Sequence, residues 1–289
     1  MRANSSRALK ILLLCAVVML SACGMMRIAY NNGESLTYWW LDGYVDVEKE
    51  QRPWINERIG RLFDWHRKTQ LKDYAILLKQ TQRQLQTGID KPILLANLAE
   101  MRKRAIVTLD QALPDMADLA LDLRPQQLAA ISKKFAANNR EFRKKNLRGD
   151  LKERQRNRFD KILSQSEFWF GDFNREQEAR IRIAVYAVPI DNDLFNRARL
   201  SRQNELMRTL DKIQKERPSR EATIALLRDY TVPLLMQSGG AEFGDYFTAY
   251  HDAMLNVALE VVNTATPGQK AHAAQKLQEY IDDCNQIAG

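Results

Sequence analysis

Few side chains in this sequence have the types and spacing that catalysis or metal binding requires. His66, His251 and His272 stand far apart, and none lies in an H-x-x-H or H-E-x-x-H pattern. A zinc site needs three or four converging ligands, and Asp191-Asn192-Asp193 lacks the later Gly and Glu of a calcium loop. We therefore predict no catalytic residues, no metal site and no cofactor. The protein is expected to bind rather than to catalyse, and an unrecognised hydrolase is the less favoured alternative.

Positive charge is concentrated in one stretch of the chain. Residues 133–161 hold twelve Lys and Arg against four Asp and Glu. The net charge of this stretch therefore equals the net charge of the whole chain, +8. We expect a single basic helix here, within 125–164. Clustered cations attract anions, so this is a candidate surface for an anionic partner, and a solvated face balanced by acidic neighbours is the alternative. The candidate cations are Lys133, Lys134, Arg140, Arg143, Lys144, Lys145, Arg148, Arg154, Arg156 and Arg158.

The N-terminus is typical of an export signal. Basic residues precede the apolar run 11–20, which is about half as long as a membrane-spanning helix. The following Leu20-Ser21-Ala22-Cys23 resembles the lipobox of bacterial lipoproteins. That resemblance implies cleavage after Ala22 and acyl chains on Cys23. Gly24 replaces the Asp that retains many such proteins at the inner membrane, so the expected location is the periplasmic face of the outer membrane.

Composition favours an all-α body. Glycine and proline are scarce, with 12 and 8 residues, while strong helix formers dominate. We predict a multi-helix bundle of about eight helices, at 51–87, 92–112, 125–164, 174–188, 192–216, 219–237, 241–263 and 267–287, with Pro114 among the breaks. The predicted organisation is a signal peptide at 1–22, a lipidated N-terminus and short tether at 23–33, and helical halves at 34–165 and 166–289.

A recurring five-residue pattern marks four helix starts and ends each time in glutamine, at Gln51, Gln127, Gln177 and Gln269. In the last two copies Asn174 and Thr266 can form a capping box with the glutamine, whereas the first two copies lack a good cap side chain. Apolar residues follow each glutamine at +4 and +8, which places them on one helix face. Gln51 precedes Gln177 by the same interval as Pro92 precedes Pro218. This spacing favours two similar halves, and chance likeness between amphipathic helices is the alternative.

Two resemblances bear on function. Tyr30-Asn31-Asn32, the stretch 40–45 and Gln51 resemble a family of uncharacterised proteobacterial lipoproteins, which brings no established activity. The helix start Thr266-Pro267-Gly268-Gln269 resembles the LTxxQ motif of the Spy/CpxP periplasmic stress proteins, although Ala265 replaces the leading Leu. Those proteins are small helical chaperones, so this second resemblance implies chaperone activity.

The sequence therefore predicts an outer-membrane lipoprotein that acts by binding, in a chaperone-like or envelope-stress role. Its expected partners are the membrane, through the lipid on Cys23, and unfolded proteins or anionic envelope components, but not nucleic acid. The alternative is a structural or assembly factor that binds one envelope partner or an anionic envelope polymer. The aromatic cluster Tyr38, Trp39, Trp40 and Tyr44 fits either the head-group interface or core packing. Cys284 fits a semi-buried apolar position on the last helix or a disulfide between chains.

Overall fold

The computed structural model describes residues 25–236 and 240–289. Over these ranges all regular structure is helical, which confirms the all-α prediction. The helices are α2 (Met25–Asn31), α3 (Gly33–Val45), α4 (Arg52–Thr69), α5 (Leu71–Thr87), α6 (Lys91–Asp122), α7 (Pro125–Asn146), α8 (Leu151–Phe170), α9 (Arg175–Tyr186), α10 (Asn192–Glu216), α11 (Arg220–Leu235), α12 (Gly240–Thr264) and α13 (Pro267–Ala288).

The predicted count of about eight helices is wrong, because the described residues form twelve. Two of the extra helices, α2 and α3, precede the first helix that was predicted. The predicted helix 51–87 divides at Gln70 into α4 and α5. There Thr69 Oγ1 donates to Trp65 O at 2.7 Å, a bond of the kind that bends helices.

The basic stretch also forms two helices rather than the single one predicted over 125–164. α7 ends at Asn146 and α8 begins at Leu151. Between them Gly149 has a positive φ of 82°, a conformation that glycine adopts at little cost. Asp150 then accepts a hydrogen bond from Glu153 N at 2.8 Å and caps α8. The chain therefore turns in the middle of its most basic segment.

Pro114 does not break a helix, contrary to the prediction. α6 continues through it as one helix of 32 residues. A proline inside a helix costs about 3 kcal/mol because one N–H is lost and the ring crowds the preceding turn. Here Leu113 and Ala117, on either side of it, are buried in a core that Leu227 of α11 shares. Packing of α6 against α11 offsets the cost of the proline.

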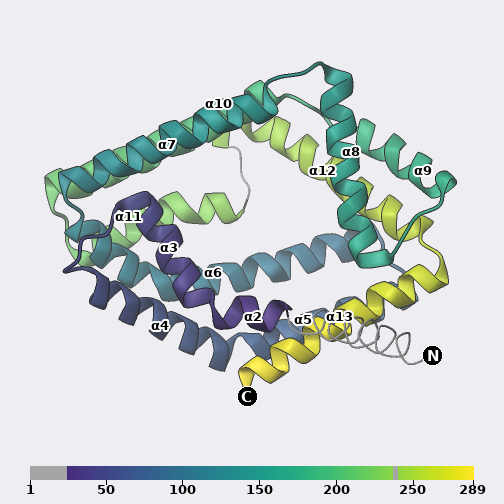
Figure 1. Cartoon of the computed structure of the whole chain (residues 1–289), viewed down its shortest axis with the longest axis horizontal. Coiled ribbons are helices and arrows are strands. Elements are labelled where there is room, and N and C mark those ends of the chain that lie inside the picture. The colour runs from purple at the N-terminus through teal and green to yellow at the C-terminus, as the bar shows by residue number, and fades with distance from the viewer. Residues whose placement is uncertain (1–24, 237–239) are drawn as a thin grey trace, which may run out of the picture.

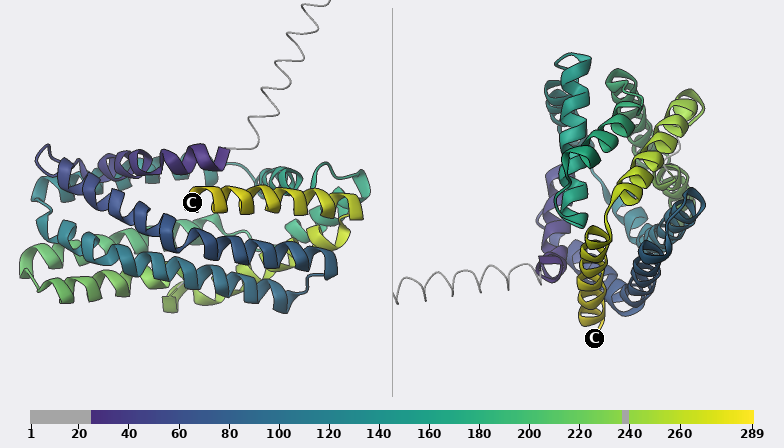
Figure 2. Two further views of the ribbon diagram at one scale, coloured as in Figure 1. Left: turned by 90° about the horizontal axis from the view of Figure 1, so that it is seen from below. Right: turned by 90° about the vertical axis from the view of Figure 1, so that its right-hand side faces the viewer.

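The helices follow one another around a ring when the molecule is viewed down its shortest axis (Figure 1). α7 and α10 form the upper left side in that view, α8, α9 and α12 the right-hand end, and α5 with α13 the lower right side. α4 lies at the lower left, α3 lies left of centre inside this outline, and α6 runs beside α11. Figure 2 shows α2 and α3 along one outer face of the molecule.

Two large hydrophobic cores stabilise this arrangement. One lies among α3, α4, α6, α7, α10 and α11, and the other among α5, α8, α9, α12 and α13. The apolar positions predicted after the four glutamines lie in these cores. Phe135 packs against the first core while partly exposed. The other seven are buried: Ile55, Ile59, Ile131, Ile181, Val185, Ala273 and Leu277.

The four glutamines of the recurring pattern form two pairs, one beside each large core. Gln127 Nε2 donates to Gln51 Oε1 at 2.8 Å, and Gln51 Nε2 donates back at 3.4 Å. Gln177 Nε2 likewise donates to Gln269 Oε1 at 2.8 Å, and Gln269 Nε2 donates back at 3.4 Å. Each glutamine also accepts from the backbone N–H three residues before it. One side chain thus caps its own helix and joins that helix to a second one.

Helices of the two predicted halves pack on each other. α13 lies along α5, the most extensive helix–helix contact among the described residues, and α7 lies along α10. The predicted division at 34–165 and 166–289 stays a prediction, but segments assigned to the two halves interlock. No helix within the described ranges is both long and apolar enough to cross a membrane.

Candidate binding site

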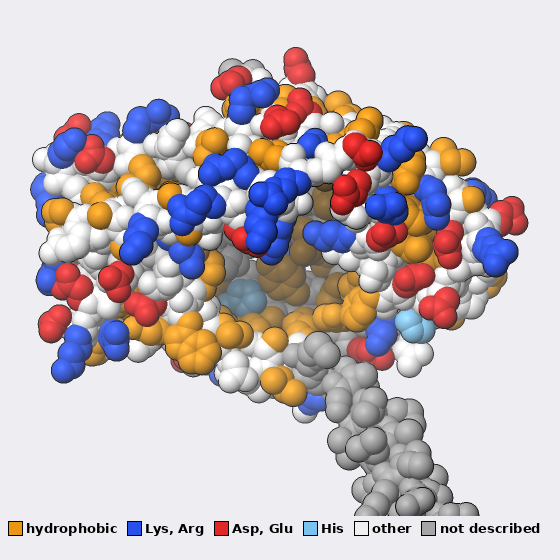
Figure 3. Space-filling view, turned by 45° about the horizontal axis from the view of Figure 1, so that its top comes forward, with side chains coloured by type: hydrophobic (Ala, Val, Ile, Leu, Met, Phe, Trp, Pro, Cys, Tyr) orange, Lys and Arg blue, Asp and Glu red, His pale blue; other side chains and the backbone are white. Residues whose placement is uncertain are grey.

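A cavity of about 1100 Å³ opens between α6, α10, α12 and the end of α11. The space-filling view shows a hollow at the centre of the molecule, with hydrophobic side chains at depth and Lys and Arg side chains along its upper edge (Figure 3). Binding pockets for small molecules usually have volumes of about 300–1,000 Å³. This cavity is therefore large enough for a drug-sized molecule or a short stretch of polypeptide.

The wall of the cavity is mainly apolar. Leu95 and Leu98 of α6 and Met236, just after α11, line it with large parts of their side chains exposed. Phe195 of α10 meets Phe247 of α12 edge to face, with ring centroids 5.2 Å apart. Apolar side chains exposed to water in a concave surface raise the free energy of the protein, and contact with an apolar ligand lowers it.

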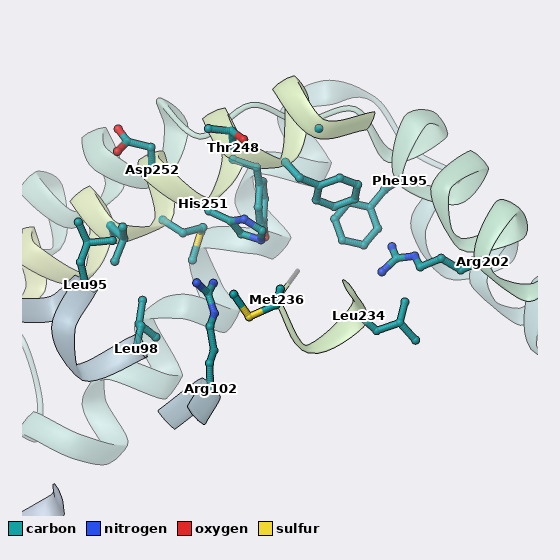
Figure 4. Close-up of a pocket in the computed structure, with 16 residues that line it drawn as sticks. Leu95, Leu98, Arg102, Phe195, Arg202, Leu234, Met236, Thr248, His251 and Asp252 are labelled. Carbon is teal, nitrogen blue, oxygen red and sulfur yellow. The ribbon is translucent and has the colours of Figure 1, made fainter. Parts of the chain in front are cut away.

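Two guanidinium groups and one imidazole add polar character to this wall. Arg102 reaches from α6 toward His251, and Arg202 extends from α10 into the same space (Figure 4). The Arg202 guanidinium lies 5.6 Å from the centre of the Phe247 ring. Within the described part of the chain, neither arginine has a carboxylate partner at ion-pair distance. The two cations are thus available to an anionic group on a ligand.

The surroundings of His251 favour its neutral form. Burial lowers its pKa, and the charge of Arg102 lowers it further. Its neighbour Asp252 forms an ion pair with Lys91 and points away from the other labelled side chains in Figure 4. Near neutral pH the cavity therefore carries positive charge from Arg102 and Arg202 and a neutral imidazole between apolar groups.

The predicted basic surface is divided between solvent and the interior. Seven of its ten cations are exposed on α7, on the turn after it and on α8: Lys133, Arg140, Arg143, Lys144, Lys145, Arg148 and Arg156. We call these seven the basic surface. Lys145 pairs with Glu141 at 2.9 Å on the same helix, as expected for a solvated face.

The other three predicted cations have structural contacts. Lys134 Nζ lies 5.5 Å from the centre of the Tyr44 ring. Arg154 donates to Leu147 O at 2.9 Å and holds the turn between α7 and α8. Arg158 donates to the carbonyls that follow α9, and burial lowers its pKa. Sequence spacing could not separate these roles from those of the exposed cations.

The residues of the cavity were not predicted as a site. Their signal in the sequence is an excess of apolar residues at the start of α6, since Leu94, Leu95, Leu98 and Met101 are more than one buried face requires. Leu94 packs toward a core, whereas the other three are exposed. The arginines that complete the wall come from helices a hundred residues apart, so only the fold brings them together.

The cysteines and histidines do not converge. Within the described ranges no group of three His, Cys, Asp or Glu could hold a metal ion. Cys284 is buried on α13 in a small core with Leu71 and Ala75, and burial raises the pKa of its thiol. This confirms an apolar position on the last helix, and the burial opposes a disulfide between chains. Ala22 and Cys23 lie outside the described residues.

Comparison with known proteins gives a family but no activity. No curated protein and no solved structure matches the chain. A family model described as "Family of unknown function (DUF6279)" matches residues 43–231. The expectation of an uncharacterised family is thereby confirmed. Because the match covers more than half of the sequence, the chain belongs to the DUF6279 family of unknown function.

Proposed function

We propose that this protein is a lipid-anchored, chaperone-like binding protein at the periplasmic face of the outer membrane. The observation that carries the proposal is the cavity, which combines exposed apolar side chains with Arg102 and Arg202. An extended segment of an unfolded protein that has apolar side chains and an acidic residue is complementary to such a wall. The likeness of Thr266–Gln269 to the LTxxQ motif of periplasmic stress chaperones agrees with this role.

The location in the proposal depends on the N-terminal sequence. Leu20-Ser21-Ala22-Cys23 resembles a lipobox, and Gly24 provides no retention signal for the inner membrane. Two acyl chains or more are needed for a stable anchor, and the modification implied for Cys23 supplies them. A binding protein attached in this way would meet unfolded proteins as they approach the outer membrane.

The test is suppression of aggregation by the mature chain carrying Cys23→Ser, followed as light scattering of an unrelated unfolding protein. We expect suppression that weakens as salt is raised, because salt screens the two arginines. Leu95→Gln with Leu98→Gln should remove most of the effect. The matched control is Ile183→Gln, which alters an exposed apolar residue of α9 outside the cavity and should leave suppression unchanged. No suppression by the unaltered chain at stoichiometric excess would contradict the proposal.

The basic surface favours a second candidate, an assembly factor that binds one anionic envelope partner or polymer. Its seven exposed cations lie on α7, the following turn and α8 rather than in the cavity. Arg143→Gln with Lys144→Gln should then abolish capture of that partner in cross-linking from intact envelopes and leave aggregation unaffected. If this pair of changes has no effect on cross-linked partners, the basic surface is a solvated face.

A further inference from the structure

α2 and α3 form an almost continuous rod on the outside of the molecule. Across the single residue between them, Asn32 N donates to Ile28 O at 3.1 Å and Leu36 N donates to Asn32 O at 3.0 Å. Helical periodicity therefore carries over from one helix to the other. Figure 2 shows this rod along one edge of the body in both views.

The inner face of the rod is fixed to the body. Tyr30 Oη lies 3.0 Å from His66 Nδ1, and Arg27 Nε pairs with Asp283 of α13 at 2.9 Å. Further along, Tyr38 and Tyr44 pack against the first large core. For these two members of the aromatic cluster, core packing is what the structure shows.

The outer face of the rod has the opposite character. Large apolar side chains are exposed along it, with exposed fractions of 65 % for Ile28, 50 % for Leu36, 66 % for Trp39 and 65 % for Trp40. Their spacing of three, four or eight residues places them on one stripe. The other exposed residues of the stripe are uncharged: Ala29, Asn32, Ser35 and Gly43. Two adjacent exposed tryptophans on an uncharged stripe mark an interaction surface.

The stripe lies directly after the predicted lipidation site. Cys23 precedes the first residue of α2, Met25, by two positions, so the two are at most about 7 Å apart along the chain. A bilayer that holds acyl chains on Cys23 therefore begins at one end of the rod. At the other end, Lys134 Nζ lies 3.9 Å from where a Cβ on Gly43 would be, so a cation borders the stripe there.

We propose that the outer face of α2 and α3 lies flat in the head-group region of the membrane, with Trp39 and Trp40 at the interface. Tryptophan is enriched at this depth because its ring is apolar and its N–H is polar, and amphipathic helices bind in the interface plane. Membrane contact along the whole rod fixes the orientation of the body, which a lipid on a short tether alone does not. The proposal rests on the anchor that is part of the proposed function.

Fluorescence quenching in vesicles tests this surface. The lipidated protein is reconstituted in vesicles of phosphatidylethanolamine and phosphatidylglycerol that contain brominated lipid. We expect quenching of tryptophan emission that is largely lost with Trp39→Ser and Trp40→Ser, while Trp54, Trp65 and Trp169 stay unquenched. The matched control, Ile183→Ser with Tyr186→Ser, changes two exposed residues of α9 and should leave quenching as it was.

A second arm separates the surface from the anchor. The mature chain carrying Cys23→Ser should still bind the same vesicles, and the two tryptophan changes should weaken that binding on the order of tenfold. Mass spectrometry of the N-terminus reports the lipid independently, and aggregation assays report the cavity. Equal quenching with and without Trp39 and Trp40, or a dimer in solution that buries the stripe, would overturn the proposal even if Cys23 is lipidated.

Discussion

The two glutamine pairs have the same design but different surroundings. Gln51 and Gln127 are both buried, Gln127 with only 2 % of its surface exposed. In the second pair Gln177 is buried, whereas Gln269 is only partly so. The first pair is therefore closed to water on both sides, and the second is open on one side.

Their outer partners differ as well. Gln51 Nε2 donates to the Asp122 carboxylate at 2.7 Å, but the second pair donates only to backbone carbonyls, those of Thr264 and Asp172. At the second pair the side chains of the N-cap residues Asn174 and Thr266 also accept from the helix backbone, whereas the N-cap residues at the first pair, Gln51 and Arg124, make no such bond. The first junction is stabilised by burial and a charged partner, and the second by N-cap side chains. One sequence pattern can thus stabilise a helix junction in two ways.

The largest effect is expected for Gln127→Ala. This change removes the acceptor for Arg124 N and the donors to Gln51 Oε1 and Asp46 O. Water cannot easily replace these bonds in a buried site, so the free energy of unfolding should fall by about 2–4 kcal/mol. Urea denaturation followed by circular dichroism measures it. A loss below about 1 kcal/mol would show that the buried pair contributes little to stability.

Gln269→Ala should have a smaller effect, about 1–2 kcal/mol. The bonds lost, to Gln177, Asp172 O and Thr266 N, are as many as at the first pair, but solvent can reach the partners that remain. The Thr266 hydroxyl also continues to accept from the backbone N–H of residue 269. The same denaturation experiment measures the loss in the free energy of unfolding for both variants. If Gln269→Ala costs as much as Gln127→Ala, burial is not what distinguishes the junctions.

The local parts of these junctions could be predicted from the sequence. The starts of α7, α9 and α13 follow the recurring pattern, and the capping boxes at Asn174 and Thr266 form as expected. These features involve residues three positions apart, which local geometry fixes. The burial of apolar residues after each glutamine follows from helical periodicity for the same reason.

The pairing of the glutamines could not be predicted, because the partners lie 76 and 92 residues apart. The same holds for the cavity, whose walls come from four helices. The turn at Gly149 and Asp150 is different, since glycine followed by a cap residue was a visible stop and start signal. The prediction of one helix over 125–164 missed this signal.

The aromatic cluster shows what the sequence could predict about side-chain orientation and what it could not. Sequence identified Tyr38, Trp39, Trp40 and Tyr44 as either a membrane-facing or a core cluster. The structure divides them, with the tyrosines packed inward and the tryptophans exposed. Which face of α3 turns inward depends on α4 and α7, and their placement is a property of the fold.

The smallest expected effect concerns the caps. Thr266→Ala removes the hydroxyl that accepts from Gln269 N at 3.2 Å and should cost about 1 kcal/mol, as loss of a helix cap usually does. The residue at the corresponding position of α7 is Arg124, whose side chain cannot accept such a bond and instead pairs with Glu48 at the surface. Because exposed ion pairs contribute about 0–1 kcal/mol, Arg124→Ala should lower the free energy of unfolding by less than Thr266→Ala. Thermal denaturation of the two variants side by side shows which one is less stable. The reverse order would mean that the first junction depends on its surface ion pair as much as on the buried amides, and the contrast between burial and capping would then fail.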